Sequence, residues 1–261
     1  MTEFSITTTI NGQVYTEEQL ERLKYERALH VLHEFKRLGV DLKDEDGKVY
    51  SDTDLNWLEP QKAMSLLEKT HYTLGSERTI EIMKPVFEDS AKRWREFNQR
   101  PIEEQGCWLG ITHFDIKGLT MSQVQKAMAT MQNGMTPFKI MPEHYGVAGE
   151  IATGQTIMEA FGCFGEPVCT HGIGSQTIPA YTGAKRHEDY PLVLAGEVHL
   201  ADNDENIHVG AIHEFKPNSE GLEMISTFFC PKDAPQAIAK GHTIHFALEV
   251  GGMMKLAAGV K

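Results

Sequence analysis

Short runs of strand-forming residues, separated by turn formers, fill the chain between residues 106 and 230. The runs rich in β-branched and aromatic residues are 107–113, 138–141, 146–151, 192–199, 207–215 and 222–229. Stretches rich in Asn, Asp, Pro and Gly, such as 202–206 and 216–221, join several of them and suit tight turns. This pattern predicts a meander of antiparallel strands, with one helix expected inside it over 120–133.

A long helix is predicted after these strands, from residue 234 to residue 258. Gly241, Gly251 and Gly252 weaken it without ending it. An antiparallel sheet that curls around such a helix encloses a cavity, and one face of the helix points into that cavity. The fold class predicted from this pattern is α+β.

The start of the chain has clear local signals. Apolar residues alternate with polar ones around Asn11-Gly12, which predicts two short strands and a hairpin turn. Thr16-Glu-Glu-Gln19 then has the pattern of a capping box, so a helix is expected to begin there and to end at Gly39.

Further helices are predicted over 60–72 and 76–98, with Pro85 kinking the second. Few strand signals occur in this part of the chain. We therefore divide the sequence into a mainly helical N-terminal region, residues 1–100, and a second domain, residues 101–261.

The formal net charge of −12 limits the partners of this chain. Nucleic acids and anionic membrane surfaces would repel it, so neither is expected as a partner. No apolar run approaches the roughly 18 residues of a membrane span, and the polar first residues do not match a secretory signal. We expect a cytoplasmic protein, and we leave open a homo-oligomer with the N-terminal helices as its interface.

The predicted C-terminal helix carries two candidate metal ligands, His245 and Glu249. Four residues is about one turn of a helix, so these two side chains share a face. His242 lies on the same stripe. An imidazole and a carboxylate together suit zinc, or manganese or iron if oxygen ligands dominate. An ordinary solvated pair is the alternative, so a metal site needs further ligands.

His113 and Glu143 are the best further candidates, since each follows an expected strand and strand ends can aim side chains at a common point. With His245 and Glu249 they make a set of two histidines and two carboxylates, with room for a water. Five other residues compete with them as ligands: His144, Glu150, His171, His199 and His213.

Four blocks of sequence occur in a familiar order over residues 105–258. They are Gly-Leu-Thr at 118–120, Lys-Ile-Met-Pro-Glu-His-Tyr at 139–145, the segment 213–229, and His245-x-x-x-Glu249. In this order and spacing the chain resembles the family of 2,4-diacetylphloroglucinol hydrolase and phloretin hydrolase. The first hundred residues have no counterpart in this resemblance.

The resemblance implies a helix-grip fold of the birch-allergen type, a zinc ion, and hydrolysis of a carbon–carbon bond next to an aryl ketone. It places the metal ligands at His113, Glu143, His245 and Glu249. A further histidine, which holds a phenol oxygen of the substrate, maps to His213 by local pattern. By its distance from Glu143 it maps to His199, so the candidate catalytic residues are His213, His199 and Glu143.

The chain also departs from the family pattern. A tryptophan-rich segment with a histidine is replaced by Gln-Lys-Ala-Met-Ala-Thr at 125–130, and an aromatic residue is Met141 here. The tyrosine expected shortly before His113 is missing, and the asparagine expected three residues after it is Ile116. We therefore expect the metal ligands of the family to be present, and the residues of its aromatic pocket to be replaced.

Together these features predict a metal-dependent retro-Claisen hydrolase that acts on a small ketone or phenol. The substrate would be an acylphloroglucinol or another β-diketone, and a cyclic 1,3-diketone such as a reduced phloroglucinol is the alternative. Two other functions stay open: a helix-grip protein that only binds a hydrophobic ligand, and a mononuclear non-haem iron oxygenase, for which two histidines and one carboxylate suffice.

Overall fold

A computed structural model describes residues 3–130, 135–150, 154–163 and 166–260 of the chain. The strands are β1 (Ser5–Ile10), β2 (Gln13–Tyr15), β3 (Cys107–Lys117), β4 (His144–Glu150), β5 (Gly154–Glu159), β6 (Val168–Ser175), β7 (Leu192–Leu200), β8 (Asn206–Pro217) and β9 (Gly221–Pro231). The α-helices are α1 (Glu17–Arg37), α2 (Asp52–Asn56), α3 (Pro60–Phe97), α4 (Ile102–Gln105), α5 (Met121–Thr130), α6 (Thr136–Ile140) and α7 (Gln236–Ala258). Two short 3-10 turns, η1 (Phe161–Cys163) and η2 (Ala180–Thr182), complete the described elements.

The strands form one antiparallel sheet in the order β2-β1-β3-β9-β8-β7-β6-β5-β4, and this sheet is not closed. Its central ladders are regular, and β3 pairs with β9 over its whole length. The register shifts at His144/Gly146 and at Val198/His199, and such bulges bend a sheet. The predicted α+β class is confirmed.

The N-terminal strands join the same sheet as the rest of the chain. Asn11 and Gly12 both have positive φ, as the predicted tight hairpin requires. β1 then pairs with β3, so that Thr8 lies opposite Phe114. Residues 1–100 therefore supply two strands to the sheet as well as helices.

The helices of the N-terminal region begin and end close to the predicted positions. Thr16 and Gln19 form the expected capping box at the start of α1. α3 is broken at Gly75, which has φ 63° and ψ 174°, so it consists of the two predicted helical segments. Pro85 lies inside the second segment and keeps helical backbone angles, so the break in α3 is at Gly75 and not at the predicted Pro85.

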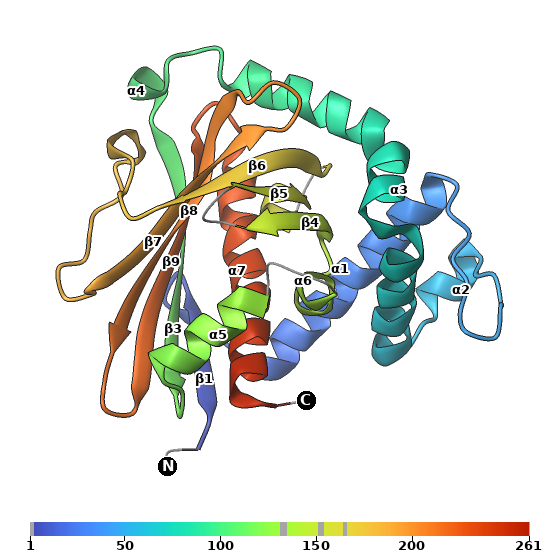
Figure 1. Cartoon of the computed structure of the whole chain (residues 1–261), viewed down its shortest axis with the longest axis horizontal. Helices are drawn as coiled ribbons and strands as arrows, with labels where there is room; N and C mark the ends of the chain where they lie inside the picture. Colours follow the sequence, from blue (N-terminus) through green and yellow to red (C-terminus); the bar gives the residue numbers. More distant parts are fainter. Residues whose placement is uncertain (1–2, 131–134, 151–153, 164–165, 261) are drawn as a thin grey trace.

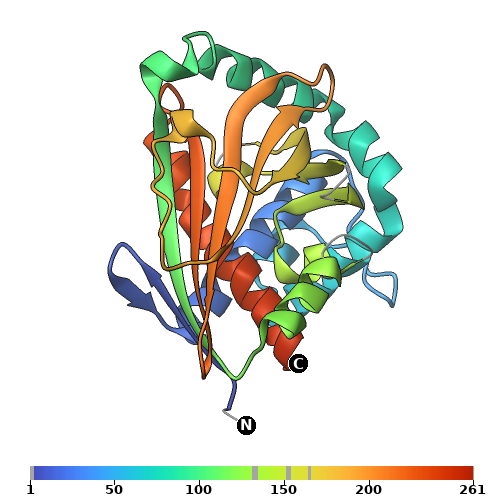
Figure 2. The same cartoon turned by 60° about the vertical axis from the view of Figure 1, so that its left-hand side comes forward.

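Helix α7 runs along one face of the sheet, while α3 passes over one end of the molecule and packs against β4 and β6 (Figure 1). At β3 the contact with α7 is close: the buried Thr112 hydroxyl donates a 3.0 Å hydrogen bond to the Thr243 carbonyl. A Cβ on Gly110 would lie 2.1 Å from the Ala239 carbonyl oxygen. The β4–β5 end of the sheet also reaches α7, so the sheet curves around this helix (Figure 2).

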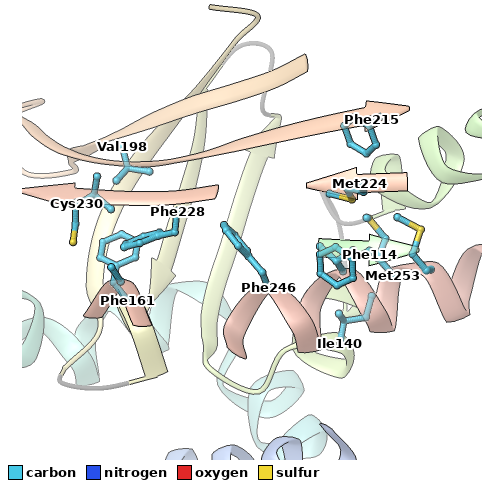
Figure 3. Packing of buried hydrophobic residues seen from close by; sticks show 14 of the residues in the cluster. Phe114, Ile140, Phe161, Val198, Phe215, Met224, Phe228, Cys230, Phe246 and Met253 are labelled. Atoms are coloured by element: carbon cyan, nitrogen blue, oxygen red, sulfur yellow. The ribbon is translucent and has the colours of Figure 1, made fainter. Parts of the chain in front are cut away.

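Two apolar cores lie on either side of the β4–β5 hairpin. The larger fills the space between the sheet and α7, where Phe246 lies between the Phe161–Phe228 pair and Phe114 (Figure 3). The second packs α1, α2 and α3 against β4 and β5, with Tyr145 at its centre. Strand β4 therefore has a buried side chain layer on both faces at its start.

Some local predictions were wrong or incomplete. Residues 138–141, expected as a strand, belong mostly to α6, where Pro137 occupies a position near the helix start that proline favours. Strands β5 and β6 were not predicted, because Gly, Thr and Gln interrupt their apolar pattern. The helix expected over 120–133 is described as α5, and its last expected residues lie outside the described part. No helix among the described residues has the length and apolarity needed to cross a membrane.

Candidate metal centre

His144, His245 and Glu249 bring ligand atoms together on the concave side of the sheet, and Glu159 lies next to both histidines. The Nε2 atom of His144 lies 3.3 Å from a carboxylate oxygen of Glu159 and 3.8 Å from one of Glu249. The Nε2 atom of His245 lies 3.4 Å and 3.8 Å from carboxylate oxygens of the same two residues. Ligand atoms of His144, His245 and Glu249 all lie within 4.8 Å of one another. Separations of this size leave room for one cation between the donor atoms.

Helix α7 contributes two of these residues, His245 and Glu249. Their spacing of four residues places them one above the other on the face of α7 that meets β4 and β5. The helix is apolar around most of its circumference, as expected for a helix buried on nearly all sides. This pair was predicted as half of a metal site, and the structure brings it to the cluster.

The β4–β5 hairpin contributes the other two residues, His144 and Glu159. They are the first residue of β4 and the last residue of β5, and the antiparallel register places them directly opposite each other. The side chains of such a pair point to the same face of a sheet. One hairpin therefore presents an imidazole and a carboxylate together to α7.

The carboxylates of this cluster have imidazoles as their ion-pair partners among the described residues. None of the described residues that line the surrounding cavity is a lysine or an arginine. Burial of a carboxylate is costly unless a positive charge or several hydrogen bonds compensate. Burial raises the pKa of Glu249, and the neighbouring Glu159 adds to this rise while His144 opposes it. A divalent cation would supply the missing positive charge.

The two histidines respond to the cluster in opposite directions. Burial alone would lower the pKa of His144, but the carboxylates of Glu159 and Glu249 outweigh it and raise that pKa. Burial, with His242 and His144 nearby, holds the pKa of His245 well below its usual range. Neutral imidazole is the form that binds metals, and His245 is held in that form.

The cluster lies in the wall of a cavity of about 240 Å³. The other lining residues are mainly apolar and come from the sheet, η1, α5, α6 and α7; they include Met128, Pro137, Val147, Ile157, Phe161, Leu194, Val209, Met224, Phe228, Phe246 and Met253. An apolar cavity with a few converging polar groups is the usual form of a small-molecule site.

His213 lies in the same cavity, on β8. Its Nδ1 is 2.9 Å from the hydroxyl of the buried Ser226, and its ring meets Phe246 edge to face. Burial lowers the pKa of His213 to about 4, so its ring is neutral at pH 7. A neutral histidine in this position can donate or accept a hydrogen bond without adding charge.

The structure does not bring His113 or Glu143 to the cluster, although both were expected there as ligands. β3 continues four residues beyond His113, to Lys117, so His113 is in mid-strand and not at a strand end. Its neighbours Thr112 and Phe114 are buried, and His113 is exposed on the opposite face of the sheet. The predicted strand end was misplaced.

Glu143 misses the cluster by one position in the sequence. β4 begins at His144, which faces the cavity, while Glu143 lies 3.3 Å from Arg27 of α1. A shift of one residue in a strand exchanges its faces, so the ligand expected at Glu143 is replaced by its neighbour. His144 had been considered only as a competing candidate.

His199 and the remaining competing histidine, His171, are not in the cluster. The Nδ1 of His199 lies 3.0 Å from the Asp204 carbonyl oxygen at the end of β7, and Val198, not His199, lines the cavity. The Nδ1 of His171 lies 3.1 Å from the Thr156 hydroxyl. The structure describes no side-chain position for Glu150.

Sequence reasoning missed Glu159 entirely. Its strand was not predicted, and its partnership with His144 depends on the β4–β5 register. The only local signal is that Glu159 ends the short apolar run Ile157-Met158 before Ala160.

The comparisons with known proteins add no name to this geometry. Neither a scan against protein-family models nor a search of curated proteins finds a match for this chain. The function must therefore be argued from the site itself.

Proposed function

We propose that this chain is a metal-dependent hydrolase that cleaves a carbon–carbon bond next to a ketone. The observation that carries the proposal is the convergence of His144, Glu159, His245 and Glu249 in an apolar cavity without lysine or arginine. Two imidazoles and two carboxylates match the ligand set of zinc, and also of manganese or iron. A helix-grip fold is part of the proposal, supported by the sheet that curves around α7.

A divalent cation bound by these four residues would polarise a ketone oxygen and lower the pKa of a bound water. The rest of the reaction depends on side chains of the chain itself. The apolar walls orient a flat ring and exclude bulk water. His213, neutral and facing the cavity, can hydrogen-bond a second oxygen of the substrate and thereby fix which carbonyl lies at the ligand cluster.

The cavity also limits the size and charge of the substrate. Its volume of about 240 Å³ is below the roughly 300–1,000 Å³ of typical ligand pockets, which favours a single ring. The absence of lysine and arginine from its described lining disfavours a substrate with a permanent carboxylate or phosphate. A neutral β-diketone, either an acylphloroglucinol or a cyclic 1,3-diketone such as a reduced phloroglucinol, satisfies both conditions.

The test begins with elemental analysis of the purified protein and of two variants. We expect about one equivalent of zinc, manganese or iron in the wild type, and its loss in His245→Ala, which removes a buried ligand. His199→Ala is the matched control, because His199 lies outside the cavity, and it should keep the metal.

Acylphloroglucinols and cyclic 1,3-diketones would then be assayed for release of a carboxylic acid. Acid formation that disappears in His245→Ala supports the hydrolase. Oxygen consumption with iron would favour the oxygenase instead. Ligand binding without metal would favour a binding protein.

A further inference from the structure

The other histidine of α7, His242, is held in a single protonation state by the backbone of η1. Its Nδ1 accepts a 3.1 Å hydrogen bond from the N–H of Gly162. A peptide N–H can only donate, so this Nδ1 carries no proton. The ring is therefore neutral, and its one N–H is on Nε2.

The turn η1, which makes this contact, lies very close to α7 at Gly162. Gly162 has φ 77°, in the left-handed region that favours glycine. A Cβ at this position would lie 2.3 Å from the carbonyl oxygen of Ile238. Any other residue would push η1 away from α7 and lengthen the hydrogen bond to His242.

Aromatic neighbours fix the orientation of the His242 ring. It stacks on Phe228 with 3.9 Å between ring centroids and on His245 with 4.4 Å, at interplanar angles of 24° and 9°. Phe246 meets it edge to face at 4.6 Å. Phe228 and Phe246 belong to the apolar layer between the sheet and α7 (Figure 3). The hydrogen bond and the stacking together leave the ring one orientation.

Among the described residues, none accepts a hydrogen bond from the Nε2–H of His242. His242 lines the cavity, so this N–H can meet a molecule that is bound there. Because the His242 ring stacks on the ring of His245, this N–H lies next to the ligand cluster. A fixed, neutral donor beside such a cluster is suited to an oxygen that becomes negative during a reaction.

We propose that His242 is a catalytic hydrogen-bond donor whose Nε2–H binds the enolate oxygen of the departing half of a β-diketone. This inference rests on the proposed function. In the reaction the hydroxyl of water adds to one carbonyl carbon. The bond from that carbon to the central carbon then breaks, and its electron pair forms the enolate of the second carbonyl. The central carbon finally takes one proton, so that one water is consumed and an acid and a ketone are formed.

Three variants separate the two ring nitrogens. His242→Gln places an amide N–H near the position of Nε2, His242→Asn keeps an acceptor near Nδ1 for Gly162 but lacks the cavity donor, and His242→Phe keeps only the stacking. Each is loaded with zinc, its metal content is measured, and acetylacetone, a small β-diketone that forms an enolate, is titrated by calorimetry. We expect unchanged metal content in all three. The affinity for acetylacetone should fall by about tenfold or more in the Asn and Phe variants, because a charge-assisted hydrogen bond is lost. It should be largely restored in the Gln variant, which keeps that bond.

The protonation state is measured independently by nitrogen NMR of histidine-labelled wild-type protein, with His242→Phe to assign the signals. We expect an unprotonated Nδ1 and a protonated Nε2. The opposite tautomer would overturn the inference, as would acetylacetone binding to His242→Phe at wild-type affinity. Loss of metal in the Phe and Asn variants would also overturn it, because His242 would then be a ligand.

Failure of the proposed function gives a different result. A wild-type protein that takes up no metal removes the hydrolase proposal, while the NMR measurement still decides the tautomer. A wild type that holds zinc without binding acetylacetone removes the donor role of His242 and leaves the metal centre in place.

Discussion

The start of strand β4 is buried on both of its faces. The two faces differ in the partners that they give to buried carboxylates. Glu143 and Tyr145 face α1 and are 0% and 1% exposed, while His144 faces the cavity and is 4% exposed. On the α1 side, Glu143 has Arg27 as a partner, and Tyr145 donates to Glu34. On the cavity side, the ion-pair partners of Glu159 and Glu249 among the described residues are His144 and His245.

This difference is the reason that we place the candidate site on the cavity face and not on the α1 face. On the α1 face, the carboxylates of Glu143 and Glu34 have a guanidinium and a phenol hydroxyl as partners. The cavity face leaves two carboxylates and two imidazoles directed at one another, an arrangement that a cation completes. Burial is common to both faces, and a group of potential metal ligands is found on the cavity face.

The largest effect is expected from changing a carboxylate on the cavity face. Glu249→Gln keeps the shape of the side chain but removes its charge, so bound metal and turnover should both fall. The loss of metal affinity should exceed the roughly 10–100-fold that follows from losing an outer partner of a ligand. Elemental analysis and the acid-release assay measure both effects.

Glu143→Gln on the α1 face is the matched control for that variant. It should keep the metal, because its partner is Arg27. Equal metal content in the two variants would remove the distinction between the faces.

A smaller effect, on stability alone, is expected from Tyr145→Phe. The buried Tyr145 hydroxyl donates to Glu34, and its removal leaves a buried carboxylate oxygen without this donor. We expect the free energy of unfolding to fall by about 1–3 kcal/mol. Urea denaturation measures the change, and the metal content should stay at the wild-type value. A loss of metal here would show that the two faces are coupled.

Glu34 should make the stability of the α1 face depend on pH. Burial raises its pKa above the ordinary 4.5, and the hydrogen bond from Tyr145 and the charge of Arg37 offset this only in part. The folded state therefore holds this proton more tightly than the unfolded state. Its stabilising contribution is present below pH 4.5 and is lost as the pH rises through the folded pKa.

Glu34→Gln should remove this loss of stability at higher pH, because glutamine does not ionise. The free energy of unfolding of the variant, relative to the wild type, should therefore increase as the pH is raised above 4.5. Denaturation curves at several pH values compare the two proteins. A constant difference across this range would show that the pKa of Glu34 is not raised.

The smallest effect is expected from His113→Ala. This side chain is exposed on the face of the sheet that is turned away from α7. Stability should change by no more than about 0.5 kcal/mol, and metal content should be unchanged. Loss of metal in this variant would restore His113 to the ligand set and contradict the geometry described above.

The elements that were predictable from sequence are those whose signals are local. The Asn11-Gly12 turn, the Thr16 capping box and the alternation along β3 each depend on a few neighbouring residues. The pairing of His245 with Glu249 is of the same kind, because both lie on one helix.

The other half of the site depends on contacts that no local pattern records. His144 meets Glu159 through the register of β4 and β5, and the exchange of Glu143 for His144 follows from a strand that begins one residue from the expected place. Strand β5 itself has little of the apolar alternation that identifies a strand. His144 and Glu159, half of the ligand cluster, could therefore not be assigned from the sequence alone.

The position of the β4–β5 hairpin has a consequence for the folding of the whole chain. It forms one free edge of an open sheet, and the strand at such an edge has a neighbour on one side only. A cation held by His144, Glu159, His245 and Glu249 would cross-link this edge to the central helix. Its binding free energy would then add to the free energy of folding, as in small metal-stabilised domains. The same atoms would then both join an edge strand to the central helix and form the site of chemistry.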